Sequence, residues 1–230
     1  MVNKLKIGIM QPYFFPYIGY YQLINEVDVY VNLEHVSFMK RSYMVRNTIK
    51  DNQIINIPVS NGSQNETCNN IKTLSDINWF NKFYRKLHQL YGKEPNFDLI
   101  INEIIEPWKK HVETYDGDIS ISDFNMSSIK YVCKFLNINT IFESSVGLTN
   151  KKKNEGLQDI VKYYNGTDYI NAIGGQKLYN KDDFSSKDIN LSFIKMGDLS
   201  IKNPYNSIID VLFTNEKDII IENLKNYTLI

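Results

Sequence analysis

Residues 5–24 read LKIGIMQPYFFPYIGYYQLI. The apolar run at residues 5–10 predicts a short buried strand, and an aromatic loop follows it directly. Pro12 and Pro16 each fix their own φ angle and remove a backbone donor, so this loop should hold one defined shape. Pro16 can also occupy the first turn of a helix that continues to Ile24. The chain therefore begins with a strand, a stiff loop and a helix.

A second strand is expected at residues 27–31. About sixteen residues separate the two strands, which is enough for a right-handed parallel crossover. The aromatic loop then lies at the carboxyl end of the first strand and at the amino end of the first helix. In open α/β sheets this edge collects ligands, and the free N–H groups of the helix favour an anion.

The aromatic residues of the loop can be explained by packing or by ligand contact. Phe14 and Phe15 have no polar atoms, and we expect them in the core. Gln11, Tyr13 and Tyr20 carry polar groups, so for them both interpretations stay open. The loop is therefore the first candidate for a binding site.

The chain has 230 residues, 43% of them hydrophobic, and no Pro/Gly/Ser-rich linker divides it. This predicts a single α/β domain over residues 1–230 with a mainly parallel sheet. Residues 75–137 read as a helical insertion, with helices at 77–91, 96–115 (broken near Pro107) and 123–136, the last capped by Asp123. The other elements expected are strands at 54–59, 140–143, 168–171 and 191–194 and a helix at 154–164.

The charges of the chain cancel, with 26 basic and 26 acidic side chains. Nucleic acids and anionic membranes call for a concentrated positive field, so we expect neither as a partner. No apolar stretch reaches the length of a membrane span, and the beginning of the chain lacks an apolar signal region. Cys68 and Cys133 form no CxxC motif and are expected as free thiols, Cys133 in a helical core. These features predict a cytosolic protein.

A first group of chemically active residues follows the second strand. Glu34 and His35 could exchange protons at the strand end. Lys40 and Arg46 could hold a diphosphate, with Asn47 beside them in a loop next to the Gln11 loop. The alternative is an exposed turn with solvated charges.

A second group begins where the strand at 140–143 ends. Ser144 and Ser145 are followed by a lysine run, residues 151–153, in which a helix begins, and by Asn154. Hydroxyls, free N–H groups and ammonium groups together can hold a phosphate, although there is no Walker pattern. A solvated lysine surface is the alternative for the first two lysines.

A third group follows the strand at 168–171. The paired Gly174 and Gly175 precede Tyr179, and two glycines let the backbone approach a ligand closely. An ordinary turn explains the two glycines nearly as well.

The chain resembles the WbqC-like family. The motifs that carry the resemblance are residues 8–20, Asp28, residues 46–49, Ser144-Ser145 before residues 153–155, residues 168–171 leading to Gly174-Gly175 and Tyr179, and residues 207–212. Together they span nearly the whole chain. The family is associated with bacterial surface-polysaccharide (O-antigen) gene clusters, and one member has been proposed to be a glycine transferase. The resemblance thus implies transfer of an aminoacyl or acyl group to the amine of a nucleotide-linked amino sugar.

Such a reaction needs a base for the amine, donors for the oxyanion and cations for the diphosphate. We expect His35 or Glu34 as the base, and Gln11 and Tyr13 as the polarising donors. The residues expected to bind substrate are Gly19, Tyr20, Lys40, Arg46, Asn47, Ser144, Ser145, Lys153, Asn154, Gly174, Gly175 and Tyr179. No resident metal is expected. Two alternatives stay open: an ATP-dependent amide ligase, which would use ATP and Mg²⁺, and a noncatalytic nucleotide-sugar binding protein.

The beginning of the chain also looks like the Rossmann-like nucleotidylyl-transferase fold, in which ATP activates a carboxylate. Pantothenate synthetase is the nearest functional comparison. Tyr17 and Tyr20 stand where that fold carries two histidines around Gly19. A tyrosine stays uncharged near neutral pH and therefore supports a leaving phosphate poorly.

Overall fold

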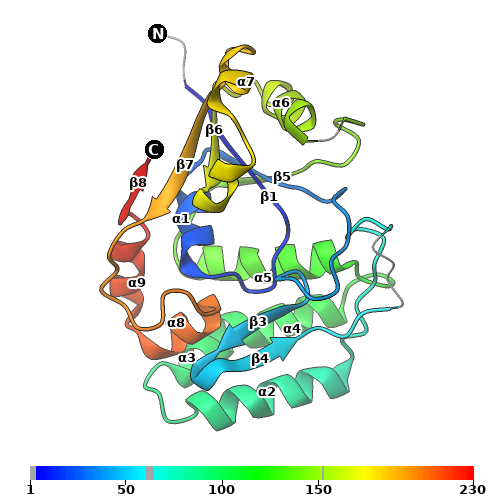
Figure 1. Cartoon of the computed structure of the whole chain (residues 1–230). Helices are drawn as coiled ribbons and strands as arrows, with labels where there is room; N and C mark the ends of the chain where they lie inside the picture. Colours follow the sequence, from blue (N-terminus) through cyan, green and yellow to red (C-terminus); the bar gives the residue numbers. More distant parts are fainter. Residues whose placement is uncertain (1–3, 61–64, 152) are drawn as a thin grey trace.

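The computed structural model describes residues 4–60, 65–151 and 153–230. It shows an α/β fold around a six-stranded sheet in the order β5-β2-β1-β6-β7-β8 (Figure 1). The first five of these strands are parallel, and β8 runs antiparallel to β7. The strands are β1 (Lys6–Met10), β2 (Val29–Asn32), β5 (Ile141–Ser144), β6 (Asp168–Ala172), β7 (Asn190–Met196) and β8 (Tyr227–Leu229). The expectation of a mainly parallel α/β sheet is confirmed.

Helices cover both faces of this sheet. The helices of the described chain are α1 (Ile18–Glu26), α2 (Ile77–Tyr91), α3 (Phe97–Ile100), α4 (Glu106–Glu113), α5 (Ile121–Phe135), α6 (Lys153–Tyr163), α7 (Lys181–Ser185), α8 (Ile208–Thr214) and α9 (Lys217–Asn223). Because strand side chains alternate between faces, Ile7 and Ile9 pack with α6 and α7, while Tyr30 and Ile170 pack into the larger core that contains α1 and α5. Figure 1 shows α6 and α7 on one side of the sheet and α1 and α5 on the other. No helix in the described part of the chain is long and apolar enough to cross a membrane.

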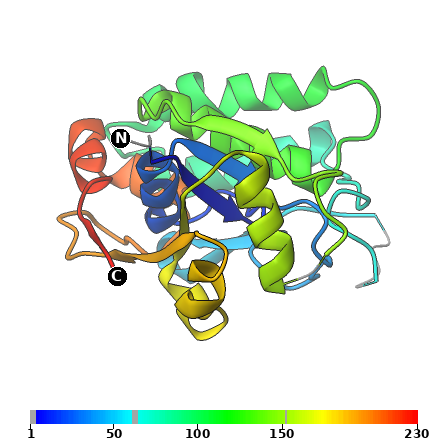
Figure 2. The same ribbon diagram turned by 90° about the horizontal axis from the view of Figure 1, so that it is seen from above.

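The strand order reverses between β1 and β6, because the chain builds outward from β1 first to β2 and β5 and later to β6 and β7. At such a switch point the loops that leave the two neighbouring strands separate, and a crevice opens at their carboxyl ends. Here these are the aromatic loop after Met10 and the 3₁₀ turn at Ile173–Lys177 after Ala172. Seen from above, α6 lies over the sheet close to the end of β1 (Figure 2).

The helical stretch expected at 75–137 contains α2 to α5, together with a π-helical turn at Ile101–Ile105. That turn precedes α4, whose first turn contains Pro107, so the predicted break is present. The cap of α5 is Ser120 and not Asp123, which corrects the prediction: the hydroxyl of Ser120 accepts from the N–H of Asp123, and the helix begins at Ile121.

A hairpin of β3 (Arg46–Ile49) and β4 (Gln53–Asn56) lies next to the helical stretch (Figure 1). The loop expected around Arg46 and Asn47 is therefore a strand. The strand expected at 54–59 already ends at Asn56, because Pro58 has no N–H with which to continue a ladder.

The aromatic loop has a strained backbone that distant side chains hold in place. Phe15 has a φ of 40°, a left-handed value that a bulky residue rarely adopts. The amide of Asn47 donates to the carbonyl oxygens of Phe14 (3.1 Å) and Phe15 (2.8 Å). Ser207 donates to the same Phe15 oxygen, and the Asn125 amide donates to the oxygen of Pro12. Three separate segments thus fix the loop that leaves β1.

Gly8 lets α1 approach the sheet closely. A Cβ atom at this position would lie 2.7 Å from Cδ2 of Leu23, inside the buried interface. We expect Gly8→Ala to lower the free energy of unfolding by about 1–3 kcal/mol, as overpacking of a core does. Gly174→Ala is the matched control, since a Cβ there meets no atom within 4 Å. Urea unfolding of both variants checks this, and equal stabilities would contradict the close packing of α1.

Candidate functional site

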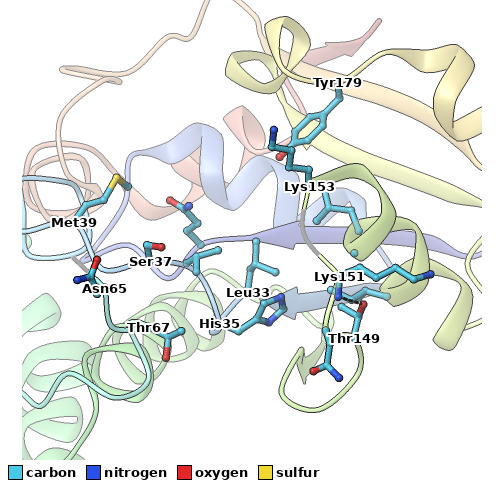
Figure 3. Close-up of a pocket in the computed structure, with 16 residues that line it drawn as sticks. Leu33, His35, Ser37, Met39, Asn65, Thr67, Thr149, Lys151, Lys153 and Tyr179 are labelled. Carbon is cyan, nitrogen blue, oxygen red and sulfur yellow. Dashed lines mark hydrogen bonds between the residues drawn. The ribbon is translucent and has the colours of Figure 1, made fainter. Parts of the chain in front are cut away.

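A cleft with a volume of about 640 Å³ opens at the carboxyl edge of the sheet (Figure 3). Its walls come from the loops after β1 and β2, from residues 65–67, from the beginning of α6 and from the segment after β6. In the close-up Leu33 and His35 lie in the middle, Lys153 and Tyr179 on one side, and Met39 and Asn65 on another. Five segments of the chain therefore meet in one cavity.

A second cavity of about 360 Å³ adjoins the first and lies at the switch point between β1 and β6. The two share four lining residues: Gln11, Leu33, Leu157 and Tyr179. The second cavity contains no lining Lys, Arg, Asp or Glu among the described residues. Its polar lining consists of amides and phenols, namely Gln11, Tyr13, Tyr17, Tyr20, Tyr169, Asn171 and Tyr179. It is an uncharged aromatic compartment next to a more polar one.

The larger cleft carries positive charge. Two lysines line it, and none of its described lining residues is Asp or Glu. Lys151 forms an ion pair with Asp159 at 3.1 Å. Lys153 has no carboxylate partner within the described residues, and Lys152 lies outside them.

The backbone adds to this positive field. The α6 helix begins at Lys153, and the first N–H groups of a helix have no intrahelical partner. They favour an anion through the helix dipole. Lys153 itself has a φ of 54°, so the backbone turns sharply into the helix at this residue. Gly156 also lines the cleft, where a Cβ would lie 2.5 Å from the carbonyl oxygen of Lys151.

Gln11 has a defined orientation between the two cavities. Its Oε1 accepts from the hydroxyl of Tyr13 at 3.0 Å, which leaves the amide Nε2 as the donor. Its backbone oxygen accepts from the hydroxyl of Tyr20, which is also hydrogen-bonded to Tyr30. Burial raises the pKa of Tyr13, so this phenol stays protonated near neutral pH.

The structure separates His35 from Glu34. His35 lines the cleft, and burial lowers the pKa of its imidazole. Glu34 lines neither cavity, and its Oε1 accepts from the amide of Asn32 at 3.0 Å. Burial is the main cause that raises the pKa of this carboxyl group. An acid–base pair of these two side chains in one cavity is therefore not formed.

The structure brings about half of the predicted site residues to the two cavities. These are Gln11, Tyr13, Tyr20, His35, Lys153, Gly174, Gly175 and Tyr179. The others line neither cavity: Gly19, Glu34, Lys40, Arg46, Asn47, Ser144, Ser145 and Asn154.

Several of the second set have visible structural partners. Gly19 is buried, and a Cβ atom at this position would lie 2.4 Å from Cε2 of the Tyr17 ring. Asn47 holds the aromatic loop, and Ser145 lies buried behind His35. Asn154 donates to the carboxylate of Asp183 at 2.8 Å.

Sequence reasoning missed residues on two of the walls. The segment containing Asn65 and Thr67 reaches the cleft because Phe38 donates its N–H to the oxygen of Glu66, a long-range contact without a sequence signature. Asn171 could have been found, since it is a polar residue near the carboxyl end of a buried strand. Tyr17 also lines the second cavity, although it is not among the predicted site residues.

Three comparisons place the chain among known proteins. A family model described as the WbqC-like protein family matches residues 11–221. The chain is similar to an uncharacterized protein, Rv1507c of Mycobacterium tuberculosis (strain ATCC 25618 / H37Rv), with 22% identity over 192 residues that cover 82% of this chain and 81% of the relative. The comparison with solved structures gave no significant match.

Proposed function

The chain belongs to the WbqC-like protein family, and from this premise we propose that it is a cytoplasmic transferase. It would join a glycyl or other acyl group to the amine of a nucleotide-linked amino sugar in surface-polysaccharide synthesis. The observation that supports the substrate class is the large cleft, where a helix N-terminus meets Lys153, a lysine that has no carboxylate partner among the described residues.

The cationic cleft fits a diphosphate. Lys153 and the first N–H groups of α6 lie together, and Thr149 and His35 add polar groups to the same cleft. The net charge of the whole chain is zero, so this positive region is local. A local cation suits a small dianion better than a nucleic acid, which needs an extended basic surface.

The aromatic cavity fits a sugar ring. Ligand pockets of this kind combine apolar walls with a few placed polar groups. Tyrosine rings offer flat faces, while Gln11, Asn171 and the phenols can hydrogen-bond to hydroxyl or amine groups. Since the two cavities share Gln11 and Tyr179, a ligand with its diphosphate at Lys153 could place its sugar here.

In the proposed reaction the amine nitrogen of the sugar attacks the carbonyl carbon of an activated glycyl or acyl donor. The C–N bond forms, the bond to the leaving group breaks, and the leaving group carries away the proton of the amine. Gln11 lines both cavities, and its amide hydrogens, for which the described residues offer no acceptor, could stabilise the oxyanion.

Lys153→Ala is expected to weaken binding of UDP and UDP-glucosamine by about 1.5–3 kcal/mol, the contribution of one charge-assisted hydrogen bond. Isothermal titration calorimetry measures this for the wild-type protein and the variant. Lys93→Ala serves as the control, because Lys93 is exposed and lines neither cavity. Equal affinities in all three proteins would remove Lys153 from the site.

Turnover is tested by incubating the protein with UDP- or dTDP-linked amino sugars and glycine donors and searching for the amide by mass spectrometry. Product formed from an activated donor without ATP supports the transferase. Product that appears only with ATP and Mg²⁺, together with consumption of ATP, would indicate an amide ligase instead of a transferase. Saturable binding of the nucleotide sugar, with no amide formed from any donor, would indicate a nucleotide-sugar binding protein.

A further inference from the structure

Ser145 and His35 form a hydrogen-bonded pair at the edge of the large cleft. The side chain of Ser145 is fully buried, and its Oγ lies 3.1 Å from Nδ1 of His35. The same oxygen accepts from the backbone N–H of Glu34 at 3.1 Å. His35 comes from the loop after β2, and Ser145 directly follows β5, which is paired with β2 in the sheet.

The position of the Ser145 hydroxyl proton decides which member of this pair donates the hydrogen bond and which accepts it. A serine hydroxyl has one proton and two acceptor positions, and buried polar groups are nearly always satisfied. Glu34 occupies one acceptor position. Within the described residues, Nδ1 of His35 is the acceptor that the Ser145 hydroxyl can reach. If Nδ1 carried the proton instead, the hydroxyl would donate to no described group, although it is shut off from water.

We infer that Ser145 holds the neutral His35 in the tautomer that carries its proton on Nε2. The Nε2–H group then acts as a hydrogen-bond donor toward an oxygen of the ligand. The ligand part of this inference rests on the proposed function, where that oxygen belongs to a phosphate or to the acyl carbonyl. The tautomer itself depends only on the free protein. Ser145 is thus a positioning residue for His35.

This assignment changes the role predicted from the sequence. A histidine protonated on Nε2 and hydrogen-bonded through Nδ1 has no free lone pair for the amine of a substrate. A neutral imidazole that donates to a developing negative charge is a known catalytic arrangement. Burial lowers the pKa of His35, which keeps the ring neutral at pH 7.

The tautomer can be measured by long-range ¹H–¹⁵N NMR of the ring nitrogens. The chain has three histidines, so His35→Gln identifies the signals of His35. We expect a nearly pure Nε2–H form for His35 above its pKa. In Ser145→Ala this should relax to a mixture of tautomers, while the ring signals of His88 and His111 stay unchanged. A dominant Nδ1–H form, or a His35 tautomer that is the same in Ser145→Ala, would overturn the inference.

The donor role is tested by two substitutions of His35. Glutamine keeps an N–H donor at a similar reach, and leucine removes it. We expect His35→Gln to bind UDP within about threefold of the wild-type protein and His35→Leu to bind about tenfold or more weakly, the loss of a hydrogen bond to a charged group. Equal losses in both variants would contradict a donor role. Failure of the wild-type protein to bind UDP or UDP-glucosamine would count against the proposed function, while the NMR result would still decide the tautomer.

Discussion

Asn47→Ala is expected to lower the free energy of unfolding by about 2–4 kcal/mol, because the buried carbonyl of Phe14 loses its hydrogen-bond donor and that of Phe15 loses one of its two. The Asn47 side chain is 4% exposed, and its amide donates to the oxygens of Phe14 and Phe15. Its Oδ1 also accepts from the N–H of Thr48. Phe15 has a strained φ, so the loop loses part of what holds it in this conformation.

Chemical denaturation with urea measures the effect, and Arg46→Ala is the neighbouring control. Arg46 is exposed and lines neither cavity, so its substitution should change stability by less than about 0.5 kcal/mol. Because the aromatic loop forms part of both cavities, Asn47→Ala should also weaken UDP binding. If Arg46→Ala weakened UDP binding while Asn47→Ala changed neither stability nor affinity, Arg46 would again be a diphosphate ligand, as the sequence predicts.

Trp108→Ala is expected to have the largest effect on stability, about 3–5 kcal/mol, as for other buried aromatic residues replaced by alanine. Trp108 is fully buried in α4, and its ring centroid lies 4.9 Å from those of Phe15 and Phe124. Its indole N–H donates to the hydroxyl of Ser127. The helical stretch and the loop after β1 thus belong to one hydrophobic core.

This variant also tests the prediction of a single domain. Far-UV circular dichroism and UDP binding should be lost together in one transition, at a lower urea concentration than in the wild-type protein. Tyr163→Ala is the control, since that side chain is 62% exposed and little change is expected. Two separate transitions, with only the helical signal shifted by Trp108→Ala, would mean that the helices fold apart from the sheet.

The sequence predicted those elements whose signals are local. The strand at Lys6–Met10, the aromatic loop and the helix at Ile77–Tyr91 follow from apolar patterns, prolines and capping residues. The short helices α7, α8 and α9 and strand β8 were not predicted. They have three to seven residues each, too few for a clear period, and long-range packing supports them.

Part of the site was predictable for the same reason. Gln11, His35 and Gly175 follow buried strands, Lys153 follows the loop after the edge strand β5, and parallel strands end at a common edge. The direction of each side chain was not predictable. Glu34 and His35 are adjacent in sequence, yet Glu34 contacts Asn32 while His35 lines the cleft. Such differences depend on packing partners that no local pattern reveals.

The central claim is that the cleft beside α6 binds the diphosphate of a nucleotide sugar while the aromatic cavity receives the sugar. A crystal structure of the protein soaked with UDP-glucosamine tests this most directly. We expect density for the diphosphate at Lys153 and the N-terminus of α6, and density for the sugar ring between Gln11 and Tyr179. Ordered ligand density at another place, with both cavities filled by water alone, would contradict the account.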